Sequence, residues 1–445
     1  MTARLAATEA TNVELRARLN QNSQNSSKPP SSDPPGAVPP KGRRKKGRKR
    51  GGQPGHVGRF AATPERVDRV EQYRPSSCKH CRADLARGAD TGTVISHFVY
   101  ELPEIRPIVT DYQCLDVQCA DCGRVTAAEL PDTVPNGSYG PTVQAMTCML
   151  RGELRQSVRQ TSDVMTQLMH VPMSTGMVAK TQDQVSSALA APHAEALAHA
   201  QRSDRAHADE TGWRQDKKKA WLWASVTPMV TVFLVRPSRG AQSAKELLGD
   251  SFTGILTVDR WASYNWVPAK RRQLCWSHLK RDFKSFLDHG PDAKQLGERL
   301  LFERRKLFRS LRLAARPVQR RILALLEEGE GLSCAKVSGM CREMLKLRDA
   351  IFTFLDQERV QPTNNAAEQA VRFAVLMRKG CFGSDSARGS RFIERFLTVR
   401  MTLRRQKRDL YAFLKDACAA MLNGTEWPSL LPDSVEDTGL LATCA

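Results

Sequence analysis

Three acidic residues, far apart in the chain, lie in segments that could bring them together. Asp209 occurs in AHADETGWR, Asp259 follows the β-forming run GILTV, and Glu368 occurs in PTNNAAEQAVR. Carboxylate oxygens are the ligands that hard cations such as Mg²⁺ prefer. Two such ions about 4 Å apart can clamp the attacking and leaving oxygens of a phosphodiester. A single acidic residue is usually a solvated surface charge, so this chemistry depends on the elements that carry all three.

The elements around the first two acids follow a definite order. We expect a short strand over 206–213 with Asp209, two further strands, a helix, and then a strand over 254–261 with Asp259. The two intervening strands are 220–228 and 231–237, and the helix is 243–249. Alternation along the first strand turns Glu210 to the opposite face, which makes it a less suitable ligand.

The third acid belongs to a later helix. After a strand and helix over 271–287 and a long, charged, amphipathic insertion, Asn364 or Asn365 can cap a helix whose first turn holds Glu368. A ribonuclease-H-like fold places one acid on its first strand, one on the fourth strand beside it and one on such a helix. The chain repeats this linear order, so the strands and the acids predict the same fold.

Two cysteine pairs, Cys78-Lys-His-Cys81 and Cys119-Ala-Asp-Cys122, have the spacing of zinc knuckles. Each pair can place two thiolates on one tetrahedral ion, and both pairs together complete a four-cysteine site. Gly123 supplies a tight turn that aims backbone amides at sulfur. Four thiolates leave no open position, so the sequence predicts a structural Zn²⁺. Unligated buried cysteines are the alternative.

The composition points to a polyanionic partner. The formal net charge is +21, from 68 basic and 47 acidic residues, which favours nucleic acid first and an anionic membrane surface second. The run 41–50 is the densest, and such runs bind phosphate without sequence preference. Its predicted DNA contacts are Arg43, Arg44, Lys45, Lys46, Arg48, Lys49 and Arg50. A solubilising or localising charge run is the alternative.

No stretch of 18 apolar residues and no N-terminal signal pattern occurs in the sequence. We therefore expect a soluble protein without membrane contact, located in the cytoplasm of a bacterium and associated with its nucleoid. A reducing compartment keeps the twelve cysteines free of disulfides, which favours the metal interpretation of the two pairs.

The predicted fold class is multidomain α+β, with a zinc-ribbon-like domain and a ribonuclease-H-like α/β catalytic domain that has a helical insertion and a helical C-terminus. The expected segments are a short zipper-like helix at 1–22, a disordered basic linker at 23–62, the zinc-binding domain at 63–135, a helical segment at 136–204, the catalytic domain at 205–388 with its insertion at about 285–358, and a helical region at 389–445.

Two of these segments allow alternatives. Polar Thr8 and Asn12 interrupt the N-terminal heptad seam, so a solvated single helix is an alternative to a coiled coil there. Within 136–204, two helices joined by a turn at 170–174 are compatible with a DNA-binding helix-turn-helix whose second helix begins near Ser174. Helix pairs of this kind are also common without DNA binding.

Long blocks of the chain resemble the transposases of the insertion sequence 66 (IS 66) family, of the DDE type, over essentially the whole length. The blocks are NSQNSSKPPSSD, GRKRGGQPGHVG, the paired CxxC knuckles, ADETGWR, VDRWASY, QLCWSHLKRDF and PTNNAAEQAVRFAVLMRKGCFGSDSARGSRF. The resemblance implies a zipper-like segment, a zinc-binding domain and a catalytic domain whose DDE acids match Asp209, Asp259 and Glu368. Gln369 stands where the family usually has arginine, which removes a basic contact but no metal ligand.

The residues and the resemblance together favour a DDE transposase that cleaves DNA and transfers the freed 3′ hydroxyl to target DNA during transposition of an insertion sequence. Two Mg²⁺ (or Mn²⁺) ions held by the three acids would activate the nucleophile and stabilise the leaving oxygen. The expected partners are element ends and target DNA, a second copy of the chain on DNA, and companion proteins of the same element. A nuclease without strand transfer and a non-catalytic zinc DNA-binding regulator are the alternatives.

Four further residues are candidates for supporting roles. His278, in CWSHLKRD, could contact phosphate or orient an acid, or it could be a packed structural histidine. Arg372 lies one turn after Glu368, and Arg378 with Lys379 follows on or just past the same helix, where they could contact DNA or form a solvated helix end. Most tryptophans near the acids should be core residues, although one near Asp259 could stack on a flipped base.

Overall fold

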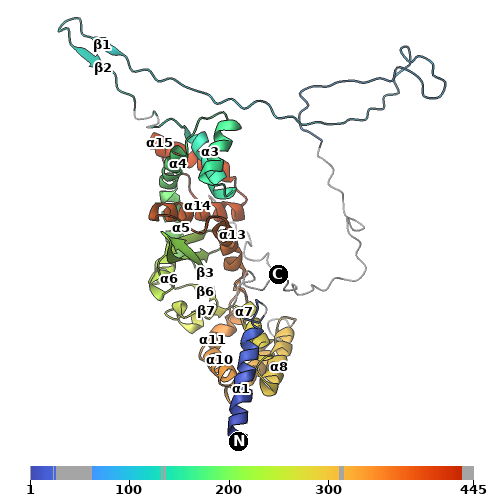
Figure 1. Ribbon diagram of the computed structural model, residues 1–445, viewed down its shortest axis with the longest axis vertical. Coiled ribbons are helices and arrows are strands. Elements are labelled where there is room, and N and C mark those ends of the chain that lie inside the picture. The colour runs from blue at the N-terminus through green and yellow to red at the C-terminus, as the bar shows by residue number, and fades with distance from the viewer. Residues whose placement is uncertain are drawn as a thin grey trace. The chain divides into compact units, whose positions relative to one another are not determined.

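The computed structural model describes residues 2–23, 25–26, 63–131, 134, 137–309 and 315–432 (Figure 1). The chain divides into two compact units, Pro34–Arg106 and the remainder formed by Met1–Asp33 and Pro107–Ala445. Each unit is described by itself. The predicted basic arm at 41–50 and the end of the chain from 433 lie outside the described residues. None of the described helices is long and apolar enough to cross a membrane.

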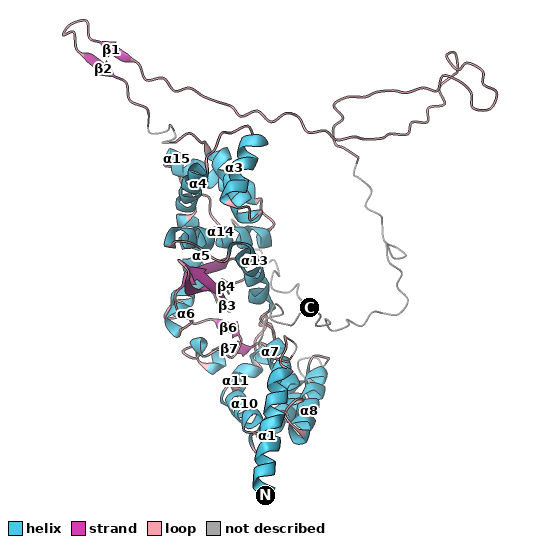
Figure 2. Cartoon of the chain, in the orientation of Figure 1, coloured by secondary structure: helices cyan, strands magenta, loops and turns pink. Residues whose placement is uncertain are grey.

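A five-stranded mixed sheet forms the centre of the larger unit, with helices around it (Figure 2). The strand order is β5-β4-β3-β6-β7, in which β3 pairs antiparallel with β4 and parallel with β6. The strands are β3 (Arg205–Gln215), β4 (Lys218–Val226), β5 (Thr231–Arg236), β6 (Ile255–Val258) and β7 (Arg272–Leu274). All five strands that the sequence predicts are confirmed, and the chain has the mixed α and β architecture expected.

Helices from distant parts of the sequence cover this sheet and share its hydrophobic core. They are α2 (Pro141–Cys148), a π-helical turn (Met149–Glu153), α4 (Thr175–Ala188), α5 (Ala190–Gln201), α6 (Ala241–Leu248), α13 (Asn365–Cys381), α14 (Ala387–Gln406) and α15 (Leu410–Asn423). The boundaries that we expect at 204 and 388 therefore fall within one packed core rather than between separate ones.

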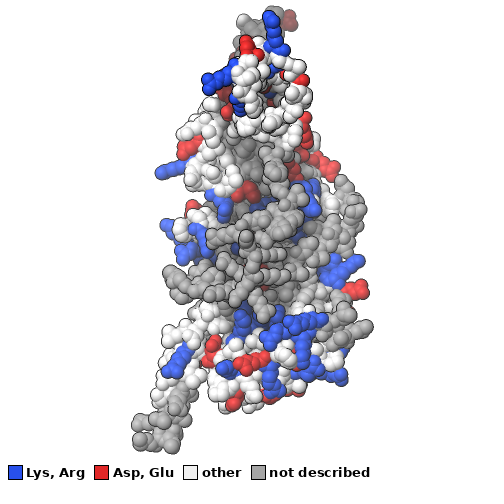
Figure 3. Space-filling model, turned by 90° about the vertical axis from the view of Figure 1, so that its right-hand side faces the viewer, with Lys and Arg blue, Asp and Glu red and all other residues white. Residues whose placement is uncertain are grey.

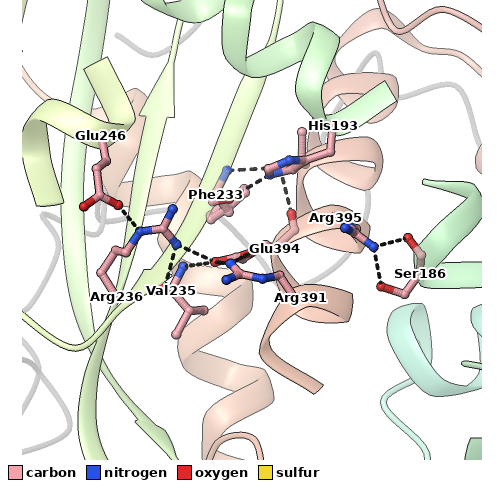
Figure 4. A network of polar contacts seen from close by, with 10 residues as sticks. Ser186, His193, Phe233, Val235, Arg236, Glu246, Arg391, Glu394 and Arg395 are labelled. Carbon is pink, nitrogen blue, oxygen red and sulfur yellow. Dashed lines mark hydrogen bonds and ion pairs between the residues drawn. The ribbon is translucent and has the colours of Figure 1, made fainter. Parts of the chain in front are cut away.

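Strand β5 is an edge of the sheet, and helix α14 closes it. The backbone N–H groups of Thr231, Phe233 and Val235 donate to side chains of α14, over 3.0, 3.0 and 2.7 Å respectively. The acceptors are Thr402, Thr398 and Glu394, one per helical turn. Figure 4 shows Glu394 reaching both Val235 and Arg236. This pairing satisfies N–H groups that an open edge would offer to another chain.

The helix pair within 136–204 is present as expected. Helix α3 (Val158–Gln167) ends before a turn, and Ser174 then caps α4 by accepting from Met177 N. A small core of its own lies between these helices, around Met165, Met173 and Val178. The prediction of two helices with a second start near Ser174 is confirmed, and its role in DNA binding stays a prediction.

The insertion between β7 and α13 is helical and has a separate core. Its helices are α7 (Trp276–Phe286), α8 (Pro291–Leu307), α9 (Arg316–Glu330), α10 (Ala335–Lys346), α11 (Arg348–Ile351) and α12 (Thr353–Asp356). Short 3-10 turns at Ala262–Tyr264 and Ala269–Arg271 connect β6 to β7. The N-terminal helix α1 (Thr2–Leu19) is also present, and after it the Asn25 amide donates to Asp288 over 2.9 Å.

Candidate catalytic and metal-binding sites

The pairing of β3 with β6 places Asp209 and Asp259 at the same level of the sheet. The last paired residues of the two strands are His207 and Thr257, and each acid lies two residues further along. Asp209 therefore lies within β3, and Asp259 directly follows β6, at the same level of two neighbouring parallel strands. The strand order alone therefore brings together two acids that are 50 positions apart in the sequence.

The third acid comes close enough to act on the first. Burial raises the pKa of Asp209 well above its ordinary value, and the negative charges of Glu210, Asp259 and Glu368 raise it further. Helix α13, which carries Glu368 in its first turn, packs on β3 and β4. The charges of Asp259, after a strand, and Glu368, on a helix, thus both act on Asp209, although among the described residues the oxygens of the three acids do not all lie within 4.8 Å of one another.

Glu210 lies in a different, neutralising environment. Its side chain is only 2% exposed, and Oε1 pairs with Arg239 Nη2 over 2.6 Å. Its other oxygen accepts from the Tyr264 hydroxyl over 2.7 Å. Both oxygens are therefore occupied, as expected for the acid that alternation turns away from the candidate metal side.

The two candidate aspartates, in contrast, are hydrogen-bonded to backbone amides. Asp209 accepts from the backbone amide of Glu210, and Asp259 accepts from the backbone amide of Trp261, each over 2.9 Å. Within the described parts of the chain, neither aspartate has an ion pair with lysine or arginine. Carboxylate oxygens such as these are the donors that Mg²⁺ prefers.

A buried junction holds the three acid-bearing elements in register. Asn364, 1% exposed, donates from its side-chain amide to the carbonyl of Ala208 over 2.8 Å. Its backbone N–H donates to Cys275 Sγ over 3.1 Å, and the backbone N–H of Cys275 donates to the carbonyl of Val258 over 2.8 Å. Ala208 and Val258 directly precede the two aspartates. Asn364 and Cys275 therefore connect the backbone next to each aspartate to the start of α13.

This junction revises one detail of the sequence interpretation. Asn364 is the N-cap residue of α13, but its side chain does not cap the helix. The amide reaches β3 instead, where its oxygen lies 3.2 Å from Nδ1 of His207. Sequence reasoning did not identify Asn364 and Cys275 as positioning residues; the signals were an asparagine just before the Glu368 helix and a cysteine three residues before His278.

His278 lies beside the third acid, as expected for a supporting residue. Its Nδ1 is 3.5 Å from Glu368 Oε1, and the Cys275 thiol is 3.8 Å from the same oxygen. Among the described residues, Cys275, His278 and Glu368 form a group whose ligand atoms lie within 4.8 Å of one another. Burial lowers the pKa of His278 and raises the pKa of Cys275 to about 11, so both side chains are predominantly neutral near pH 7.

The predicted basic contacts on α13 occupy different surroundings. Arg378 donates to the carbonyl of Gly212 and to the Thr211 hydroxyl, which ties the end of α13 to β3. Arg372 and Lys379 are exposed. Elsewhere, Figure 3 shows Lys and Arg side chains crowded over the lower part of one face, with acidic side chains among them; α7 and α8 occupy this part of Figure 1. Contact of any of these residues with DNA stays a prediction.

The two cysteine knuckles have the same local geometry. In the first, Cys78 N–H donates to the Ala83 carbonyl and Arg82 N–H donates back to the Cys78 carbonyl, over 2.8 and 2.9 Å. In the second, Cys119 exchanges equivalent bonds with Arg124 and Gly123 over the same distances.

Backbone amides point at the leading sulfur in both knuckles. Hydrogen bonds from the N–H groups of Cys81 and His80 lower the pKa of the Cys78 thiol, and those of Cys122 and Asp121 lower the pKa of Cys119. The turn that follows has a positive φ in each case, 62° at Arg82 and 68° at Gly123. The backbone of each knuckle therefore favours the thiolate form of its first cysteine.

The second knuckle lies in the loop of a two-stranded hairpin, β1 (Asp116–Gln118) and β2 (Val125–Ala127). The first lies within an isolated antiparallel bridge between Ser77 and Asp84. The first knuckle belongs to the Pro34–Arg106 unit and the second to the other unit. A shared four-cysteine zinc site stays a prediction.

The chain matches two family models and is similar to two curated proteins. The family model described as Transposase IS66 family matches residues 136–391, more than half of the chain, and a model of a family of unknown function (DUF6444) matches residues 1–61. Two uncharacterized proteins of Sinorhizobium fredii are similar. The protein y4qI is 26% identical over 248 residues, 47% of this chain and 45% of the relative. The protein y4hP is 25% identical over 404 residues, 79% of this chain and 72% of the relative.

Proposed function

We propose, from the premise that this chain belongs to the IS66 family of transposases, that it cleaves DNA strands and joins them to target DNA through Asp209, Asp259 and Glu368. The observation that carries the proposal is the register of β3 and β6, which sets Asp209 and Asp259 at one level of the sheet, with Glu368 in the first turn of a helix that packs on β3. The curated relatives are uncharacterized, and the match spans less than half of y4qI. The activity and its partners are therefore proposals about this chain.

The sheet supports a ribonuclease-H-like catalytic domain. Strand β3 lies at the centre, the two strands that follow it pair antiparallel on one side, and β6 and β7 pair parallel on the other. The acids occupy the first strand, the end of the fourth strand beside it, and a later helix, which is the arrangement that this fold class uses. The helical insertion lies between the fifth strand and that helix.

The residues fit a pair of hard divalent cations. Asp209, Asp259 and Glu368 would supply carboxylate oxygens, and the backbone amides of Glu210 and Trp261 orient the two aspartates. When bound, two Mg²⁺ or Mn²⁺ ions would stabilise the attacking and leaving oxygens of the phosphodiester. Asn364 and Cys275 hold the strand ends and the helix at a set spacing, which catalysis by positioned charge requires.

In this proposal, two neighbouring side chains orient the carboxylate of Glu368. His278 and Cys275 lie against its Oε1, so they limit the orientations that its carboxylate can adopt.

No serine or tyrosine of the chain would act as the nucleophile in this reaction, because water and then the freed 3′ hydroxyl would attack phosphorus directly. The two knuckles would hold one structural Zn²⁺ through Cys78, Cys81, Cys119 and Cys122.

Strand joining is the test that separates this function from its alternatives. The full chain is incubated with Mg²⁺ and duplex DNA that carries the inverted repeats flanking its coding region. We expect nicks at the repeat ends and, with target plasmid added, covalently joined products. Nicks without joined products would instead identify a nuclease, and retention of the DNA without nicks would identify a regulator.

The Asp209→Asn variant tests the role of the acids with two measurements. It keeps the size of the side chain and removes the charge, so nicking should fall by at least about a hundredfold while the protein remains folded. Mg²⁺ should raise the unfolding temperature of the wild type and not that of the variant. The control is Asp416→Asn, an exposed acid of α15, which should behave as wild type. Unchanged nicking by Asp209→Asn would remove the basis of the proposal.

A further inference from the structure

Trp261 is an exposed aromatic residue held rigidly beside the acid cluster. Its backbone N–H donates to Asp259 Oδ1 over 2.9 Å, and its indole Nε1 donates to the carbonyl of Arg239 over 3.2 Å. Both N–H groups are therefore satisfied within the protein, yet 38% of the residue is exposed. The exposed part of the indole is an aromatic surface that needs no further hydrogen bond.

Arg239 lies between Trp261 and a second tryptophan. The guanidinium carbon is 3.8 Å from the ring centroid of Trp261 and 4.8 Å from that of Trp221. Glu210, buried behind the site, pairs with Arg239 and sets its position. Lys219 lies 5.2 Å from the Trp221 ring and adds positive charge. We call this arrangement the Trp221–Arg239–Trp261 stack.

Trp261 is far more exposed than the three tryptophans that lie in the hydrophobic cores. Trp213, Trp223 and Trp276 are at most 2% exposed, as expected for residues that only fill a core. A tryptophan with a packing role alone would be expected to bury its ring in the same way. Trp261 stays 38% exposed even though two hydrogen bonds and the Arg239 guanidinium fix it in place.

We propose that the Trp221–Arg239–Trp261 stack is a docking surface for an unpaired DNA base next to the scissile phosphate, with the base stacking on Trp261. This inference rests on the proposed function of the same site. Every base has a flat π face, so aromatic side chains bind single strands with little sequence preference. In a duplex both faces of a base are covered by its neighbours, so only an unpaired base can reach the indole.

The chemistry of the stack favours nucleic acid. Lys219, next to the Trp221 ring, can attract a phosphate of the bound strand. The hydrogen bond from the Trp261 backbone N–H to Asp259 keeps the indole next to this candidate carboxylate. An unpaired nucleotide held there would leave its phosphodiester within reach of the acids. Trp261 would thus be a positioning residue for the DNA strand that is cut.

Binding without cleavage is the direct test. The probes are a fluorescein-labelled mixed-sequence single strand of about 12 nucleotides, within the site size of single-strand grooves, and the duplex of the same sequence. Both are titrated with the full chain in Ca²⁺ and at raised salt, which weakens phosphate contacts of the basic arm. Fluorescence anisotropy reports the affinity, and circular dichroism checks the fold of each variant.

The Trp261→Ala variant should bind the single strand about 5- to 100-fold more weakly, the range that loss of one stacked base produces, and bind the duplex as wild type does. Trp261→Phe should stay close to wild type because it keeps a ring. Trp261→Leu should resemble the alanine variant, and it replaces that variant if the alanine protein does not fold. The matched control is Trp427→Ala, which removes a tryptophan that is 50% exposed elsewhere.

Three results would overturn the inference. They are single-strand binding by Trp261→Ala at the wild-type level, a loss in Trp261→Phe as large as in Trp261→Ala, and an equal loss in Trp427→Ala. The assay contains no chemistry, so its failure leaves nicking and joining by the wild type untouched. Absence of joined products from the wild type would count against the proposed function alone.

Discussion

The side-chain amide of Asn364 donates to the carbonyl of Ala208 across 156 positions of sequence. This one hydrogen bond joins the start of the helix that carries Glu368 to the residue that precedes Asp209. The amide oxygen of Asn364 also faces Nδ1 of His207, so both polar atoms of the side chain are used against the same strand. The spacing of the acid cluster therefore depends on a residue that carries no charge.

Replacement of Asn364 should damage the cluster more than it damages the fold. Asn364→Ala leaves the carbonyl of Ala208 and the ring of His207 without partners in a buried site, which costs about 1–3 kcal/mol of unfolding free energy. Nicking should fall by a larger factor than this loss of stability produces, because Glu368 moves relative to Asp209. Urea unfolding and the nicking assay measure the two effects.

The neighbouring asparagine provides the control for this variant. Asn365→Ala alters the first residue of α13 without touching β3, so stability and nicking should both stay near wild type. Equal behaviour of the two alanine variants would show that Asn364 has no special positioning role.

The closure of the sheet edge by α14 predicts a stability effect far from the acids. The hydroxyl of Thr398 accepts from Phe233 N–H over 3.0 Å and donates to the Glu394 carbonyl over 2.7 Å. Thr398→Val keeps the shape and removes both bonds, so a buried N–H loses its partner and the unfolding free energy should fall by about 1–3 kcal/mol. Thr425→Val, at an exposed position, should change it little in the same denaturation experiment.

His193 should make the larger unit less stable in acid. Burial lowers the pKa of His193, and its Nε2 lies 3.1 Å from the carbonyl of Phe233. Glu394 opposes this lowering of the pKa, while Arg395 and Arg236 add to it; Figure 4 shows these groups around the ring. The unfolded chain therefore takes up a proton before the folded chain does, so the unfolding free energy should fall as pH drops below about 6.5.

The His193→Gln variant isolates this contribution. Its unfolding free energy should depend less steeply on pH between about 6.5 and 5 than that of the wild type. A residual slope should remain, because burial also lowers the pKa of His207, to about 4. Identical slopes for variant and wild type would exclude His193 as a source of the acid sensitivity.

The cysteine knuckles predict one zinc ion per chain. Metal analysis of the purified protein should find about one equivalent of Zn²⁺, and Cys78→Ser or Cys119→Ser should each abolish most of it, since each removes one of four ligands. Cys381→Ser, an exposed thiol outside the knuckles, should keep the metal. Full zinc content in both knuckle variants would contradict a four-cysteine site.

Much of the local structure could be predicted from the sequence because it depends on neighbouring residues. The β-forming runs gave the five strands, Ser174 marked the start of α4, and a glycine after Cys122 marked the turn that aims amides at sulfur. The predicted strand order correctly made β3 and β6 neighbours, and their parallel register sets Asp209 and Asp259 at the same level.

Tertiary structure decided which side chains meet across long separations. The side chain of Asn364, one of two asparagines that could cap α13, instead bonds to β3, and Arg378 donates to the backbone of the same strand. Cys275 and the exposed ring of Trp261 acquired their places through packing of β6, β7 and α13. Periodicity and propensity describe a residue and its near neighbours, whereas these contacts arise only when separate elements share one core. The sequence by itself therefore singled out the three acids as candidates, and the folded chain determined which residues connect the elements that carry them.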